Sequence, residues 1–131
     1  MKIQAWAASL IIGVAIQATA QGQENILTAH IRADGTILRQ APHWISSVEL
    51  QSQPNYFSQY KLSLVPDQVK REPRFCVASP IDATSYERQL HGQAKVLGAP
   101  RVSHVTVMTQ LVDVVAASGD NRMEFMVMCS R

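Results

Sequence analysis

The chain has 131 residues, with 12 lysine and arginine residues against 10 aspartate and glutamate residues, and a formal net charge of +2. A charge this close to balance gives no electrostatic case for binding nucleic acid, which calls for a concentrated basic surface. The length suits one domain with a single modest core.

The first twenty residues have the pattern of a secretory signal peptide. Lys2 precedes an apolar run over residues 5–16, and the small residues Ala18 and Ala20 stand where signal peptidase recognises its substrates. This predicts cleavage between Ala20 and Gln21, which leaves residues 21–131 as one domain. A membrane anchor is the alternative, but a span needs about 20 apolar residues and no run is that long. We therefore expect export through the inner membrane to the periplasm, the cell surface or the medium.

The next segment alternates between apolar and polar side chains, which predicts a strand over residues 25–33 with one buried face. The apolar phase holds Leu27, Ala29, Ile31 and Ala33, and the polar phase holds Thr28, His30 and Arg32. We expect His30 to face outward as an exposed polar residue, and His104 likewise in its own strand. Asp34-Gly35 follows as a hairpin signal, because glycine readily supplies the positive φ of a type I′ turn.

A second hairpin is predicted where "HWISSVELQ" and "YFSQYKLSLV" flank the turn sequence "QSQPN". Four aromatic residues gather there, namely Trp44, Tyr56, Phe57 and Tyr60. We expect them to pack in the core rather than to form a ligand platform. A short strand, "RFCVAS", then carries Cys76.

The second half of the chain predicts one helix and two long strands. Asp82 is a plausible helix N-cap and Gly92 a plausible stop. The β-branched run over residues 101–117 favours a strand. In the last strand the buried phase should hold Met123, Phe125, Val127 and Cys129. Met126 and Met128 then fall on the opposite phase, as Met108 does in the preceding strand. Either both of its faces are covered or an apolar strip is exposed, and an exposed strip on an edge strand is an interaction site or a liability.

The two cysteines, Cys76 and Cys129, are expected to form a disulfide, because an even pair in an exported chain usually does. A redox or metal-binding thiol pair is the alternative, but the chain has no CxxC spacing and no histidine close to either cysteine. Short strands at turn spacing then predict a small antiparallel immunoglobulin-like β-sandwich with one short helix. No residue pattern typical of catalysis, cofactor binding or metal binding stands out, so we expect no enzyme, no cofactor and no metal.

Several short motifs occur in the order found in one family of exported proteins. The motifs are "NILTAHI", "ADGTILRQAP", "SSVELQSQP" and "YFSQY", followed by "RFCVASP" and the final "GDNRMEFMVM". In this respect the chain resembles subunits of the alpha class of chaperone–usher fimbriae, the group of the coli-surface-antigen and colonisation-factor pilins. The resemblance mainly covers residues 25–60. The chain departs from the family in its cysteine pair and in its shorter middle, which favours a minor or divergent subunit.

The resemblance implies an incomplete sandwich that a neighbouring subunit completes by donating a strand. The donor strand would be residues 25–31, with Leu27, Ala29 and Ile31 filling the groove. The partners would be other subunits of the same or a related type and a periplasmic chaperone. The function would be that of a non-enzymatic structural or adhesive subunit of a surface fibre. The alternative is a soluble periplasmic or secreted monomer that binds or inhibits a target, in which the first strand pairs within its own chain.

Overall fold

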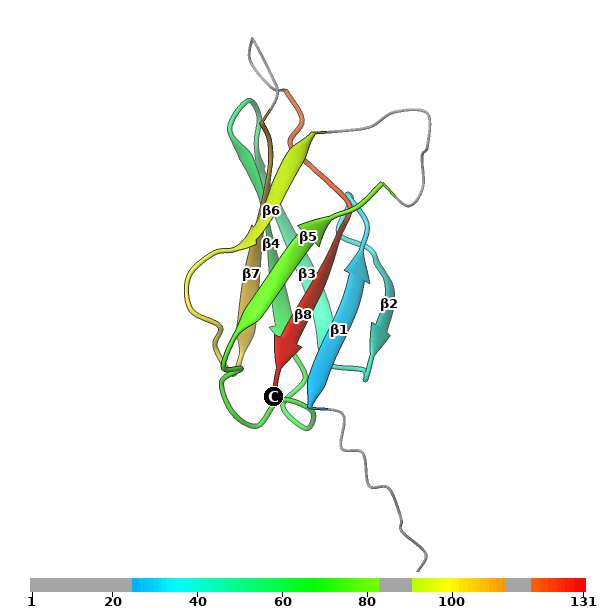
Figure 1. The fold of residues 1–131 in the computed structure, drawn as a ribbon, viewed down its shortest axis with the longest axis vertical. Coiled ribbons are helices and arrows are strands. Elements are labelled where there is room, and N and C mark those ends of the chain that lie inside the picture. Colours follow the sequence, from blue (N-terminus) through cyan, green and yellow to red (C-terminus); the bar gives the residue numbers. More distant parts are fainter. Residues whose placement is uncertain (1–24, 83–90, 113–118) are drawn as a thin grey trace, which may run out of the picture.

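The structure is a computed structural model that describes residues 25–82, 91–112 and 119–131. These residues form two antiparallel sheets of four strands in a sandwich-like arrangement (Figure 1). Sheet A has the order β2-β1-β8-β5 and contains β1 (Ile26–Ile31), β2 (Ile37–Ala41), β5 (Cys76–Pro80) and β8 (Phe125–Ser130). Sheet B has the order β3-β4-β7-β6 and contains β3 (Ile45–Gln53), β4 (Phe57–Leu64), β6 (Gly92–Val96) and β7 (His104–Leu111). The predicted mainly-β class is confirmed.

The hairpin predicted at Asp34-Gly35 joins β1 to β2. Gly35 has a φ of 89°, and its N–H donates to the Arg32 carbonyl at 2.9 Å. The Arg32 N–H donates to the Thr36 carbonyl at 2.8 Å, so the loop holds three residues and not the two of a type I′ turn. A left-handed glycine is the usual end of such a loop. A hydrogen bond from the Thr36 N–H lowers the pKa of Asp34.

The second predicted hairpin, β3–β4, begins sheet B, and its turn contains Asn55 with a φ of 65°. The Asn55 N–H donates to the Gly119 carbonyl at 2.7 Å, and the Gly119 N–H donates to the Asn55 side chain at 2.6 Å. This pair of hydrogen bonds ties the turn to the segment that leads into β8. β4 also pairs with β7, and β7 pairs with β6.

β1 lies inside sheet A, with β2 along one side and β8 along the other. Its inward residues oppose inward residues of β8, because the register pairs Leu27 with Cys129 and Ile31 with Phe125. The first and last strands that the structure describes are therefore neighbours, and each completes the hydrogen bonding of the other.

The core lies between the sheets and is built from the inward half of each alternating strand. Tyr60 of β4 is fully buried, and its ring meets that of Phe125 edge-on with centroids 4.9 Å apart. Its hydroxyl donates to the Ala33 carbonyl at 2.7 Å, and burial raises the pKa of Tyr60 to about 12. The indole N–H of Trp44 donates to the Thr28 carbonyl at 2.8 Å and links the start of β3 to β1.

The end of the chain follows its predicted alternation, since Met123, Phe125, Val127 and Cys129 are all buried. The helix predicted over residues 82–91 falls largely on residues 83–90, which lie outside the described residues, and Gly92 is the first residue of β6. The predicted signal peptide also lies outside the described residues.

Candidate functional site: the outer face of sheet A

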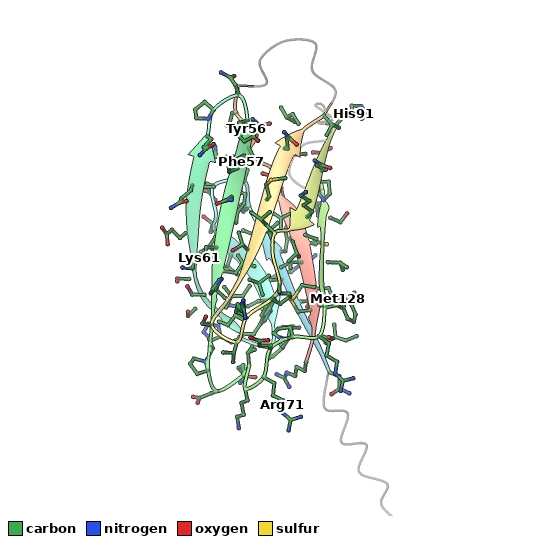
Figure 2. The ribbon with its side chains drawn as sticks, turned by 90° about the vertical axis from the view of Figure 1, so that its left-hand side faces the viewer. Tyr56, Phe57, Lys61, Arg71, His91 and Met128 are labelled. Atoms are coloured by element: carbon green, nitrogen blue, oxygen red, sulfur yellow. A yellow bond between two sulfur atoms is a disulfide. The ribbon has the colours of Figure 1, made fainter. Side chains whose placement is uncertain are left out.

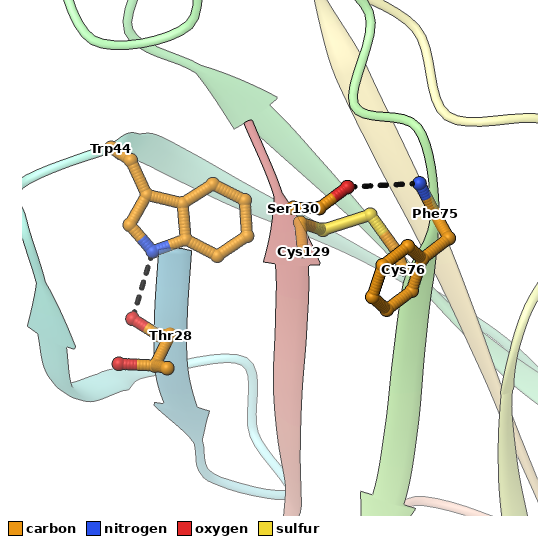
Figure 3. Close-up of a disulfide and its surroundings, with 6 residues drawn as sticks. All are labelled: Thr28, Trp44, Phe75, Cys76, Cys129 and Ser130. Atoms are coloured by element: carbon orange, nitrogen blue, oxygen red, sulfur yellow. Dashed lines mark hydrogen bonds between the residues drawn. A yellow bond between two sulfur atoms is a disulfide. The ribbon is translucent and has the colours of Figure 1, made fainter. Parts of the chain in front are cut away.

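The predicted disulfide is confirmed, and it joins edge strand β5 to β8 (Figure 3). The Cα atoms of Cys76 and Cys129 are 4.1 Å apart, close to the spacing of opposed residues that exchange no backbone hydrogen bonds. In the adjacent pair the Ser130 N–H donates to the Phe75 carbonyl at 3.0 Å, and the Phe75 N–H donates to the Ser130 hydroxyl at 3.3 Å. Cys129 is fully buried, so the bond lies on the inner face of the sheet.

The residues on either side of the disulfide in β5 and β8 point the other way and help to form the outer face of sheet A. The register arranges this face in three rows across the strands. The first row holds Ile26, Ser130 and Phe75; the second holds Ala41, Thr28, Met128 and Val77; the third holds Arg39, His30, Met126 and Ser79.

Five large apolar side chains of these rows remain open to solvent. Their exposed fractions are 51% for Ile26, 53% for Phe75, 50% for Val77, 38% for Met126 and 37% for Met128. We call these five residues the sheet A patch. The sequence left open whether both faces of the last strand are covered or whether an apolar strip is exposed, and the structure has the exposed strip.

Sheet B shows what an ordinary solvent-facing sheet looks like in this chain. Its outer face carries mainly charged and amide side chains, with Leu97 and Val112 exposed just past the ends of β6 and β7. The charged and amide side chains are those of Glu49, Gln51, Gln59, Lys61, Gln93, Lys95 and Gln110. Met108 also lies in these rows and is only half-buried. Figure 2 places Lys61 and Met128 on opposite sides of the molecule. Since contiguous exposed apolar surface usually marks a contact site, the sheet A patch is the strongest candidate for a functional surface.

Charged residues near the patch are mainly cationic. Arg39 occupies one corner of the third row. Beyond the first row, a hollow of about 460 Å³ is lined by Asn25, Asp67, Gln68, Val69, Lys70, Arg71 and Arg131, and we call it the basic hollow. Figure 2 shows Arg71 at that end of the sandwich. The hollow adjoins the patch, because Asn25 directly precedes Ile26 and its carbonyl accepts a hydrogen bond from the Arg131 N–H at 2.8 Å.

The prediction that His30 faces solvent is wrong, since this side chain is only 3% exposed. Its Nε2 contacts the carboxylate of Glu124, which is also buried. Alternation along a strand tells which face a residue occupies, but it does not tell which distant segment covers that residue, and here Glu124, from the segment that leads into β8, packs against His30. A polar group in such a position needs a partner, and Glu124 supplies one. His104 is half-buried, with its Nδ1 3.0 Å from the Ser103 hydroxyl.

The residues predicted to fill a neighbouring subunit lie in the core of their own chain. Leu27, Ala29 and Ile31 are each at most 5% exposed, and β2 and β8 pair with both sides of their strand. Donation of this strand to a second copy stays a prediction. Ala20 and Gln21, at the predicted cleavage site, lie outside the described residues.

A second depression lies at the other end of the sandwich, beside the β3–β4 turn. It measures about 460 Å³ and is lined by Leu50, Ser52, Gln53, Pro54, Ser58, Gly119, Asp120, Asn121 and Arg122. The Arg122 guanidinium donates to both carboxylate oxygens of Asp120 at 2.8–3.0 Å. These bonds lower the pKa of Asp120 and raise that of Arg122. The two charges neutralise each other, which makes this depression a weaker candidate.

Two of the four aromatic residues expected in the core lie outside it, since Tyr56 is at a turn and Phe57 is only half-buried and is not part of the core. Trp44 and Tyr60 are fully buried, but Tyr56 is 61% exposed at the β3–β4 turn. It packs on Phe57, with ring centroids 4.8 Å apart. Tyr56 belongs to the turn and not to the strand, so the alternation of β4 does not extend to it.

Sequence reasoning found Met126 and Met128 but missed Ile26, Phe75 and Val77, which lie on other strands. A signal for two of these was available. Once Cys76 is opposed to Cys129 on the inner face, the flanking residues Phe75 and Val77 must point outward beside β8. The disulfide prediction therefore implied much of the patch.

Comparison with known proteins finds no match to this chain among family models, curated sequences or solved structures. Within residues 25–82, 91–112 and 119–131, no group of three or more His, Cys, Asp or Glu side chains could hold a metal ion. In the same residues, no helix has the length and apolar character needed to cross a membrane.

Proposed function

We propose that this chain is an exported, non-enzymatic protein that acts as a monomer and binds another protein through the sheet A patch. One observation carries the choice of a monomer: β1, the strand expected to serve a neighbour, pairs with β2 and β8 of its own chain. With that strand in place, Leu27 and Ile31 of the same chain fill the core, which supports a chain that folds without a donated strand. The disulfide supports export, since such bonds persist mainly in oxidising compartments.

The docking role rests on the difference between the two outer faces. Sheet B presents mainly charged and amide side chains, with Leu97 and Val112 exposed only at its strand ends, whereas sheet A presents five large apolar ones across the middle of its face. Two of the five are methionines, whose flexible thioether side chains adapt to varied partner surfaces. Burial of the patch under a partner would remove apolar surface from water, which is the main source of favourable free energy in association.

Sedimentation equilibrium of the secreted protein tests the monomeric state. We expect a single species with the mass of residues 21–131 at every concentration. Leu27→Asp should unfold it, because an unpaired charge in the core costs several kcal/mol. Thr28→Asp, at an exposed position of the same strand, is the matched control and should leave the fold intact. Polymers that grow with concentration and disappear when β1 is removed would contradict the proposal.

A fibre subunit assembled by strand donation is the second candidate. It is favoured by the position of β1, the first strand described, which lies between β2 and β8. A strand from another copy could take this place in the same register. A labelled peptide of residues 25–31, added to protein that lacks residues 21–31, separates the two candidates. Stable binding of the peptide and loss of self-association of that protein would favour the fibre subunit.

The immunoglobulin-like type of sandwich belongs to the same proposal. Its support is the pair of antiparallel four-stranded sheets. The feature to compare with an experimentally determined structure is the strand order of sheet A, in which the first and last strands are neighbours.

A further inference from the structure

The outer face of sheet A has a consistent electrostatic character. None of the outward side chains in its four strands is a carboxylate, and the charged one at its corner is Arg39. Glu124 lies close by, just before β8, but its side chain is buried against His30. A partner that covers this face therefore meets apolar groups and positive charge.

The basic hollow extends this character past Ile26. Lys70, Arg71 and Arg131 line it together with one carboxylate side chain, that of Asp67. The guanidinium of Arg131 donates to the Gln68 side chain at 2.9 Å, which holds it at the wall of the hollow. The apolar patch and the basic hollow are neighbours, since Asn25 lines the hollow and the next residue, Ile26, belongs to the patch.

We infer that the partner segment combines an apolar stretch, which lies on the sheet A patch, with carboxylates at one end, which enter the basic hollow. This inference rests on the proposed docking role of the patch. Charge complementarity selects the partner, because cationic rims attract acidic surfaces and repel basic ones.

A second copy docked through the same face fits less well. It would bring two sets of Arg39, Lys70 and Arg71 towards each other, with Asp67 as the one carboxylate side chain that lines each basic hollow. Exposed carboxylates elsewhere in the described residues, such as Glu72 and Asp120, already pair with Arg101 and Arg122.

An anionic lipid surface also fits less well. Proteins that settle at a membrane interface usually place tryptophan or tyrosine there. Of these residues in the described part of the chain, Trp44 and Tyr60 are fully buried. Tyr56 is exposed, but it lies at the end of the molecule opposite Arg71 (Figure 2).

Fluorescence anisotropy with labelled peptides tests the inference. Three peptides share an alternating leucine–serine stretch and end in a run of glutamate, serine or lysine. We expect the glutamate peptide to bind most tightly and to weaken as salt is added. Lys70→Glu with Arg71→Glu should raise its dissociation constant about threefold for each cation removed. Met128→Asp should abolish binding of all three peptides, and Lys61→Glu on sheet B should change none, with the fold of each variant checked by circular dichroism.

The outcomes separate the inference from the proposed function. If all three peptides bind equally and Met128→Asp still abolishes binding, the docking face stands and the acidic partner is wrong. If no peptide binds at about 1 mM, or if Met128→Asp leaves the dissociation constants unchanged, both the acidic partner and the docking face are wrong. Tighter binding to anionic phospholipid vesicles than to the glutamate peptide overturns the inference in favour of a membrane. A dimer that Met128→Asp dissociates overturns it in favour of a second copy.

Discussion

The imidazole of His30 and the carboxylate of Glu124 contact each other beneath the outer face of sheet A, although 94 positions separate them in the chain. The contact joins β1 to the segment that leads into β8. Both side chains are buried, so each supplies the polar partner that the other lacks from solvent. It therefore lies at the junction of the first and last described strands, which holds sheet A together.

The first prediction removes this contact. His30→Leu removes the hydrogen bond between the imidazole and the buried Glu124 carboxylate, and loss of a hydrogen bond to a charged group costs about 1.5 to 3 kcal/mol. Urea unfolding followed by circular dichroism should show that decrease. Thr28→Val, at an exposed position of the same face, should change the free energy of unfolding by less than about 0.5 kcal/mol. A His30→Leu protein as stable as the wild type would show that the pair contributes nothing.

The second prediction concerns alkaline pH. The pKa of Tyr60 is raised from 10.0 to about 12, so the folded protein holds the phenol proton more tightly than the unfolded chain does. This stabilisation is complete below pH 10 and is lost as the pH rises towards 12, by about 2 to 3 kcal/mol in all. Tyr60→Phe lacks this phenol, and its stability should fall less over the same range. If the free energy of unfolding falls equally with pH in the two proteins, the Tyr60 phenol is not the cause of the loss.

The third prediction concerns the disulfide, which closes a separation of 53 residues. The chain-entropy estimate for a loop of this length is about 4 kcal/mol, so dithiothreitol should lower the free energy of unfolding by up to that amount. Thiol labelling of the denatured, unreduced protein should find no free cysteine. Cys76→Ala with Cys129→Ala is the control, because its stability should not respond to reductant.

The fourth prediction tests the packing at the start of β6. A Cβ on Gly92 would lie 2.7 Å from the Gln110 backbone carbonyl and would also collide with the Met123 sulfur. Gly92→Ala should therefore destabilise the fold by about 1–3 kcal/mol, as overpacked sites do. Lys95→Ala, at an exposed position of the same strand, should be nearly neutral. Equal thermal midpoints for the two variants would disprove the close approach.

The fifth prediction concerns export. Mass spectrometry of the exported protein should give a chain that begins at Gln21. Ala20→Arg should block cleavage, because signal peptidase needs a small residue there. Recovery of the wild-type chain from the cytoplasm with Met1 retained would remove the basis for export.

Much of the fold follows from local patterns in the sequence. Alternation together with Asp34-Gly35 predicts the β1–β2 hairpin, and the buried phase of the last strand is confirmed through Cys129. These features depend on neighbours in the chain, where the period of two and the turn chemistry act directly.

Features that depend on distant strands were harder to predict. The burial of His30 depends on its contact with Glu124, which lies 94 positions away in the chain and which no local pattern contains. The sheet A patch likewise arises only when register brings Ile26 and Val77 beside Met128. Its methionines were visible in the sequence, whereas its extent required the pairing of strands from opposite ends of the chain.

The bond between Cys76 and Cys129 also decides what a protease can do to this molecule. It encloses β6 and β7 and every connection between β5 and β8. A cut anywhere in that span yields two chains that stay covalently attached, with β8 still beside β1 and β5. Nicked protein would run as one band in a gel without reductant and as two bands with it, and it would fall apart only where both reductant and protease are present.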